Sequence, residues 1–137
     1  MKFLVITAFW SCIMGAIQMY WFLPDGLSCI DAKSGVIEAI IKFMIIQFVA
    51  ILGLQYVLKA KAIYTIPVFL CVFWFFINKN EFTYRHACWS TFSNQEIIEA
   101  TLIFSIVPMI TCLVVFLLGY FLMAKWQKRG NTIAENK

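Results

Sequence analysis

The sequence predicts an all-α integral membrane protein, a four-transmembrane-helix bundle made of two antiparallel hairpins with both termini in the cytoplasm. Hydrophobic side chains make up 63% of the 137 residues and charged ones only 13%, whereas soluble domains carry roughly 25% charged residues. Four apolar runs are each close to the roughly 20 residues that a helix needs to cross a bilayer. The basic residues stand at the ends of these runs and form no stripe, so we expect no nucleic-acid partner.

We interpret the chain as one polytopic domain. The predicted spans are 3–22, 36–58, 62–78 and 100–123, the outer loops are 23–35 and 79–99, and the tail is 125–137. The first span follows Lys2 and ends in the pair Tyr20-Trp21, which is typical of a membrane interface. A secretory signal cleaved after Ala16 is the alternative interpretation of this first segment.

Small residues on the first and fourth spans predict helix-packing faces. At 100° per residue, Ser11 and Gly15 share one half of the first helix, while bulky side chains occupy the other half. Ser105 and Gly119 fall in the same way on one face of the fourth helix, which also carries Pro108. Small side chains let a second helix approach closely, so we expect these four to lie at helix contacts.

The second and third spans form the tightest predicted hairpin. Ser34 is a plausible N-cap for the second span, and Glu38 and Lys42 have the spacing of a helical ion pair near its outer end. Only Lys59-Ala60-Lys61 separates this span from the third, so the two helices must run antiparallel.

The polar stretch between the third and fourth spans is the predicted contact loop. It ends in Ser93-Asn94-Gln95-Glu96, a capping box that predicts the start of the last helix. We expect the aromatic and basic residues of this stretch to touch a partner. They are Phe82, Tyr84, Arg85, His86, Trp89 and Phe92.

Charge asymmetry sets the predicted orientation. The ends that carry Lys2, Lys59, Lys61 and the basic tail belong in the cytoplasm by the positive-inside rule. Cys29 and Cys88 then fall together on the outer side, where disulfides persist. We therefore predict a Cys29–Cys88 disulfide that joins the two outer loops.

No catalytic motif emerges from the chain, so an enzyme is not expected. The topology is similar to that of quinone-linked disulfide oxidoreductases, but the Cys-x-x-Cys pair that they need is missing. Cys12, Cys71 and Cys112 stand on separate spans without ligand spacing, and His86 is the sole histidine. We expect no metal site and no cofactor.

The predicted function is contact with another membrane protein. In size and topology the chain looks like small immunity proteins that protect a bacterial inner membrane from a membrane-active toxin, and like exclusion or accessory proteins. The alternative is a component of a solute or ion transporter or channel, with Glu38, Lys42 and Gln47 beside the solute path. The sequence leaves the oligomeric state open.

Overall fold

A computed structural model describes residues 2–23, 35–87 and 92–135 of the chain. The order of elements is α1 (Lys2–Phe22), α2 (Val36–Leu58), the short 3-10 helix η1 (Lys59–Lys61), α3 (Ala62–Arg85) and α4 (Asn94–Glu135). Each of the four α-helices is long and apolar enough to cross a membrane. The all-α class and the four apolar helices predicted from the sequence are therefore confirmed.

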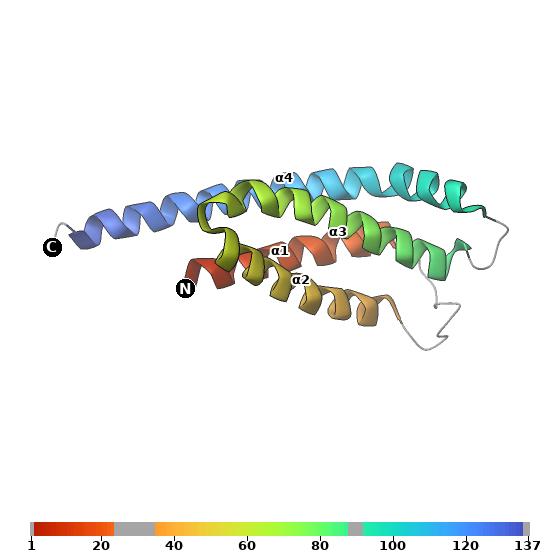
Figure 1. Cartoon of the computed structure of the whole chain (residues 1–137), viewed down its shortest axis with the longest axis horizontal. Helices are drawn as coiled ribbons and strands as arrows, with labels where there is room; N and C mark the ends of the chain where they lie inside the picture. Colours follow the sequence, from red (N-terminus) through yellow and green to blue (C-terminus); the bar gives the residue numbers. More distant parts are fainter. Residues whose placement is uncertain (1, 24–34, 88–91, 136–137) are drawn as a thin grey trace.

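The four helices run alternately up and down along one long axis (Figure 1). α1 packs mainly against α2 and α4, α4 also packs against α3, and α2 meets α3. Both chain termini lie at the same end of the bundle. We call this the terminal end, and we call the opposite end, where α1 and α3 finish, the loop end.

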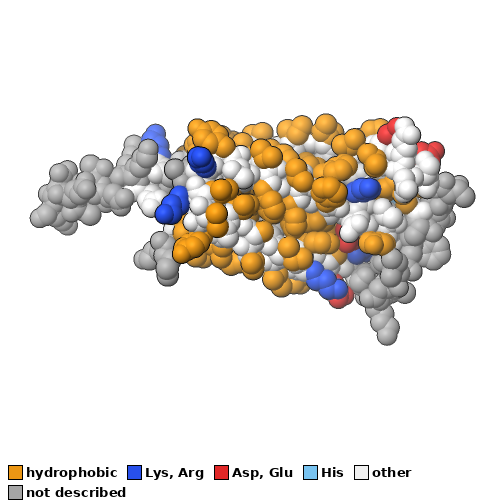
Figure 2. Space-filling model, viewed as in Figure 1, with side chains coloured by type: hydrophobic (Ala, Val, Ile, Leu, Met, Phe, Trp, Pro, Cys, Tyr) orange, Lys and Arg blue, Asp and Glu red, His pale blue; other side chains and the backbone are white. Residues whose placement is uncertain are grey.

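Apolar side chains fill the interior and also cover the outside. The main interior cluster centres on Ile66, Leu70, Trp74 and Phe116, all nearly inaccessible. The outer surface is also apolar along the middle of the bundle, and charged side chains gather toward its two ends (Figure 2). Apolar faces on both sides are what a helix bundle surrounded by lipid requires.

Buried amides join α1, α2 and α3. Gln18 and Asn78 exchange two hydrogen bonds, of 3.0 and 3.4 Å. Nearer the middle of the bundle, the Trp74 indole N–H donates to Gln47 Oε1 at 2.9 Å, and Gln47 Nε2 donates to the Ser11 carbonyl oxygen at 2.6 Å. These polar groups find their partners inside the protein, as lipid would demand.

Two predicted helix ends need correction. The third span was placed at 62–78 with a loop over 79–99, but α3 continues to Arg85. The polar pair Lys79-Asn80 favours a loop by composition, yet a helix satisfies its own backbone hydrogen bonds and can continue unbroken out of the apolar layer. In the same way α4 continues to Glu135, through the residues assigned to the tail 125–137, because Lys, Gln and Ala favour helix.

The two predicted N-caps have different outcomes. The capping box of α4 is confirmed, because Glu96 Oε2 accepts from the Ser93 amide at 2.7 Å and from its hydroxyl at 2.8 Å. Glu96 lies before the apolar segment 100–123 of α4. The hydrogen bonds from Ser93 hold the pKa of its carboxyl below the ordinary value. The N-cap of α2 is Gly35 and makes no side-chain cap bond, and Ser34 lies outside the described residues.

Candidate functional site at the loop end

An aromatic pocket lies near the loop end, between parts of α1, α3 and α4. Trp21 and Phe22 come from the last turn of α1, Phe82 from the last turn of α3, His86 from the turn that follows α3, and Phe104 from α4. Together they line a hollow of about 380 Å³. We call these five residues the aromatic pocket.

Phe82 forms the inner wall of the aromatic pocket. Its ring is 6% exposed and lies 6.5 Å from the ring of Phe22, 5.4 Å from that of His86 and 6.1 Å from that of Phe92. Ring pairs at these separations attract each other beyond simple apolar burial. The wall is therefore built of mutually supported rings from three stretches of chain.

The outer walls are open. Trp21 is 56% exposed and Phe104 is 65% exposed, although both are large apolar side chains that line the same hollow. A Trp and a Phe so placed offer contact area to an incoming apolar group with few rotatable bonds to freeze.

A buried ion pair lies beside this wall on α3. Arg85 Nε and Glu81 Oε2 are 2.7 Å apart, with side chains 2% and 11% exposed. Charges in such surroundings are costly unless they are paired, and this pair links two successive turns of the helix. The pair therefore fixes the last turn of α3, which carries Phe82 and His86.

The predicted contact residues divide into three groups. Phe82, Tyr84 and Arg85 lie on α3 and not in a loop, which corrects the sequence-based placement, and Phe82 and Arg85 are buried. His86, in the turn after α3, and Phe92, just before α4, are exposed. Trp89 lies outside the described residues.

Of the predicted packing residues, the two glycines lie at close helix contacts. Ser11 and Ser105 are buried, on α1 and α4. A Cβ added at Gly15 would lie 2.6 Å from Gln47 Oε1, and one added at Gly119 would overlap the indole of Trp10. Both glycines thus admit a bulky side chain of a neighbouring helix.

The Glu38–Lys42 ion pair is present, at 3.0 Å between Oε1 and Nζ, with side chains 54% and 63% exposed. It lies on the outer surface of α2, whereas Gln47 is buried among α1 and α3 and is bonded to both. These three residues therefore do not line a common path.

Comparisons with family models, curated proteins and solved structures found no match. The function must therefore be inferred from the geometry. Cys29 and Cys88 of the predicted disulfide lie outside the described residues, and Cys12, Cys71 and Cys112 are free thiols. Among the described residues, no group of three or more His, Cys, Asp or Glu side chains is placed to hold a metal ion.

Sequence reasoning missed much of this site. The sequence assigns Trp21 only to the membrane interface, and it singles out neither Phe22 nor Phe104. Glu81 and Arg85 have the same four-residue spacing as Glu38 and Lys42, so the helical continuation of α3 could have been found from that pattern. The pairing of Gln18 with Asn78 needs the bundle geometry and has no signal in the sequence.

Proposed function

We propose that this chain is a non-enzymatic, multi-pass protein of a bacterial inner membrane that acts by contact with another membrane protein or with a membrane-active toxin. In this proposal both termini lie in the cytoplasm and the loop end faces outward. The immunity, exclusion and accessory types of protein all belong to this class. The observation that carries the proposal is the aromatic pocket near the loop end.

The orientation is supported by the charges. Lys59, Lys61 and Lys125 are exposed, and Figure 2 shows basic side chains at the terminal end. The positive-inside rule assigns such an end to the cytoplasm. The aromatic pocket then lies in the outer half of the bundle, where it meets molecules that arrive from outside the cell or along the outer leaflet.

The pocket suits a bulky apolar side chain of a partner. Binding energy at protein interfaces is concentrated in a few aromatic anchors that fill preformed hollows. Here the inner wall is held by ring contacts and by the Glu81–Arg85 pair, so little ordering is needed when a partner docks.

The bonding of three buried amides favours contact over transport. In the described part of the bundle, the amides of Gln18, Asn78 and Gln47 are hydrogen-bonded to neighbouring helices. The Glu38–Lys42 pair lies on the outside of α2. Polar groups on a conduction path must exchange partners with a solute, and these already have partners.

Site-specific photocrosslinking tests the proposal. A photoreactive phenylalanine is placed at Trp21 or at Phe104 in cells that also express the genomic neighbours of the chain. Tyr56 and Tyr64, each 78% exposed near the terminal end, serve as matched aromatic controls. We expect one and the same protein to be crosslinked at both pocket positions and not at the controls.

The phenotypes of substituted variants provide a second test, which should identify the same pocket residues as the crosslinks. Alanine at Trp21 or Phe104 should abolish the phenotype that the chain confers, such as survival of a toxin, while Lys42→Ala preserves it at equal membrane abundance. Loss of the phenotype in Lys42→Ala with intact pocket variants would instead favour transport. Adducts with lipid alone at all four positions would contradict the proposed contact.

A further inference from the structure

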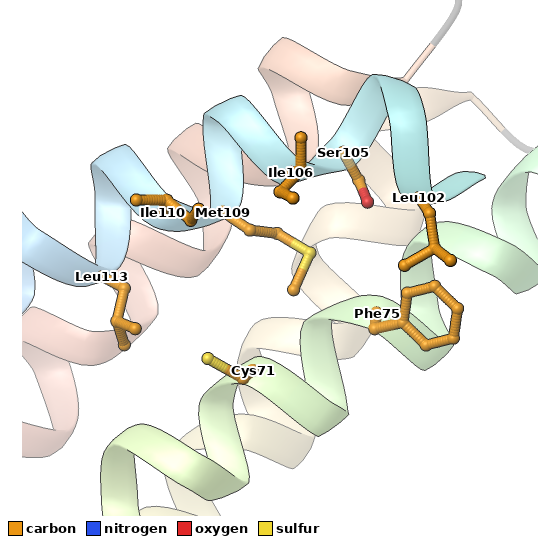
Figure 3. A pocket seen from close by; sticks show the side chains of 8 residues that line it. All are labelled: Cys71, Phe75, Leu102, Ser105, Ile106, Met109, Ile110 and Leu113. Carbon is orange, nitrogen blue, oxygen red and sulfur yellow. The ribbon is translucent and has the colours of Figure 1, made fainter. Parts of the chain in front are cut away.

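A second cavity lies between α3 and α4, separate from the aromatic pocket. Its volume is about 170 Å³. Cys71 and Phe75 line it from α3, and Leu102, Ser105, Met109 and Leu113 are among the residues that line it from α4 (Figure 3). Leu102 is half-exposed on the outer surface, so the cavity is reached from the side, where lipid surrounds the bundle.

Ser105 is the one lining residue that carries a hydroxyl. It is 1% exposed, and its Oγ has no hydrogen-bond partner. Figure 3 shows this oxygen pointing from α4 into the space between the two helices. A buried hydroxyl without a partner costs about 1–3 kcal/mol, and the cost is removed when a bound group bonds to it.

Helical serines and threonines usually avoid this cost by bonding to the carbonyl one turn earlier. Thr7 and Thr83 do so here, at 2.9 Å from the Phe3 oxygen and 2.8 Å from the Lys79 oxygen. Ser105 makes no such bond. Its hydroxyl therefore has no competing bond within α4, and a small shift of its side chain lets it bond to a molecule in the cavity.

The volume limits the size of that molecule. An apolar cavity of about 150 Å³ in another protein accommodates one benzene ring. The cavity between α3 and α4 is of similar size, and apart from Ser105 its walls are apolar side chains and the Cys71 thiol. A lipid acyl chain would fill the space but offers no hydrogen bond.

We propose that this cavity binds a lipid-soluble molecule of about one aromatic ring that carries one hydroxyl or carbonyl oxygen, which Ser105 hydrogen-bonds. The ring lies among Phe75, Met109 and Leu113, and its oxygen points toward α4. Ser105 begins the second turn of the apolar part of α4, counted from the loop end. An amphiphile that partitions just below the headgroups reaches this depth without crossing the bilayer.

The test compares two probes of equal size on the purified full chain in detergent micelles. para-Fluorophenol carries the oxygen, and para-fluorotoluene replaces it with a methyl group. Fluorine NMR titrations give both affinities, and peptide mapping reports how far each probe protects Cys71 from alkylation by a lipid-soluble maleimide. We expect the phenol to bind more tightly and to protect Cys71.

Three variants separate the contributions to binding. Ser105→Ala should weaken phenol binding roughly two- to tenfold, the value of one net hydrogen bond, and leave toluene binding unchanged. Thr101→Val is the matched control, because Thr101 is also a fully buried hydroxyl without a partner but does not line the cavity. Cys71→Leu, which narrows the cavity, should weaken both probes.

Equal affinities of the two probes, or a Ser105→Ala variant that binds phenol like the unaltered chain, would overturn the proposal and leave the cavity to lipid chains. A phenol that binds without protecting Cys71 would place the binding elsewhere and overturn it too. None of these results depends on the aromatic pocket, so the two proposals succeed or fail separately.

Discussion

Gly15→Ala should destabilise the bundle through the side chain of Gln47. The added Cβ would lie 2.6 Å from Gln47 Oε1, 3.0 Å from its Nε2 and 3.1 Å from Trp74 Nε1. These distances leave no room for the amide in its present position. Gln47 must move, and it then loses its bonds to the Trp74 indole and to the Ser11 carbonyl.

The size of the effect follows from these two hydrogen bonds. Interhelical hydrogen bonds in membranes contribute about 0.6 kcal/mol on average and about 1.7 at most. Two of them therefore give roughly 1.2 to 3.4 kcal/mol. Replacing glycine with alanine also favours helix by up to about 1 kcal/mol, so this gain must be measured separately.

Gly53→Ala provides that measurement. Gly53 lies within α2, and a Cβ added there meets no atom within 4 Å. Both variants gain the same helix propensity, so their difference isolates the clash. Unfolding in mixed micelles with increasing sodium dodecyl sulfate, followed by circular dichroism, should show Gly15→Ala less stable than Gly53→Ala by about 1–3 kcal/mol. Equal stabilities would refute the assigned role of Gln47.

Three further predictions use the same or simpler measurements. Glu81→Ala should cost about 1.5–3 kcal/mol of unfolding free energy because it removes a charge-assisted hydrogen bond to a buried guanidinium. Glu38→Ala should cost less than about 1 kcal/mol; similar losses would show that the two ion pairs have the same surroundings. Gly119→Ala should be less stable than Gly53→Ala by about 1–3 kcal/mol, because the new methyl group overlaps an indole ring. Equal unfolding midpoints of these two variants would contradict this packing. Cys29 and Cys88 should react with an impermeant maleimide on intact cells only after reduction, and labelling without reduction would disprove the predicted disulfide.

The sequence predicts the membrane fold well because its signals are local. Long apolar runs, the Lys59–Lys61 turn and the Ser93–Glu96 capping box each need only a few neighbouring residues to be recognised. They gave the number of helices and the start of α4. Helix periodicity also predicted which half of α1 is buried, as Ser11 and Gly15 show.

What could not be predicted depends on contacts between helices. Polar composition predicts a loop from Lys79 onward, but α3 continues to Arg85. Asn78, at the predicted boundary, is buried and bonded to Gln18 on α1, a partner 60 residues away. The aromatic pocket likewise combines α1, α3 and α4. A rotation of 100° per residue along a single helix gives the direction of each side chain, but it does not give the residue that the side chain contacts.

The buried amides explain how the loop end is held in place. Between helices surrounded by lipid, apolar burial provides little attraction, so small residues and hydrogen bonds must fix their positions. On α3, Trp74, Asn78, Glu81 and Arg85 recur at intervals of three and four residues and therefore share one face. Trp74 is bonded to α2 and Asn78 to α1, in ways that rotation or sliding of α3 would break. Glu81 and Arg85 are bonded to each other within α3. Because Phe82 follows Glu81 directly, the same bonds that set the register of α3 also hold the inner wall of the aromatic pocket.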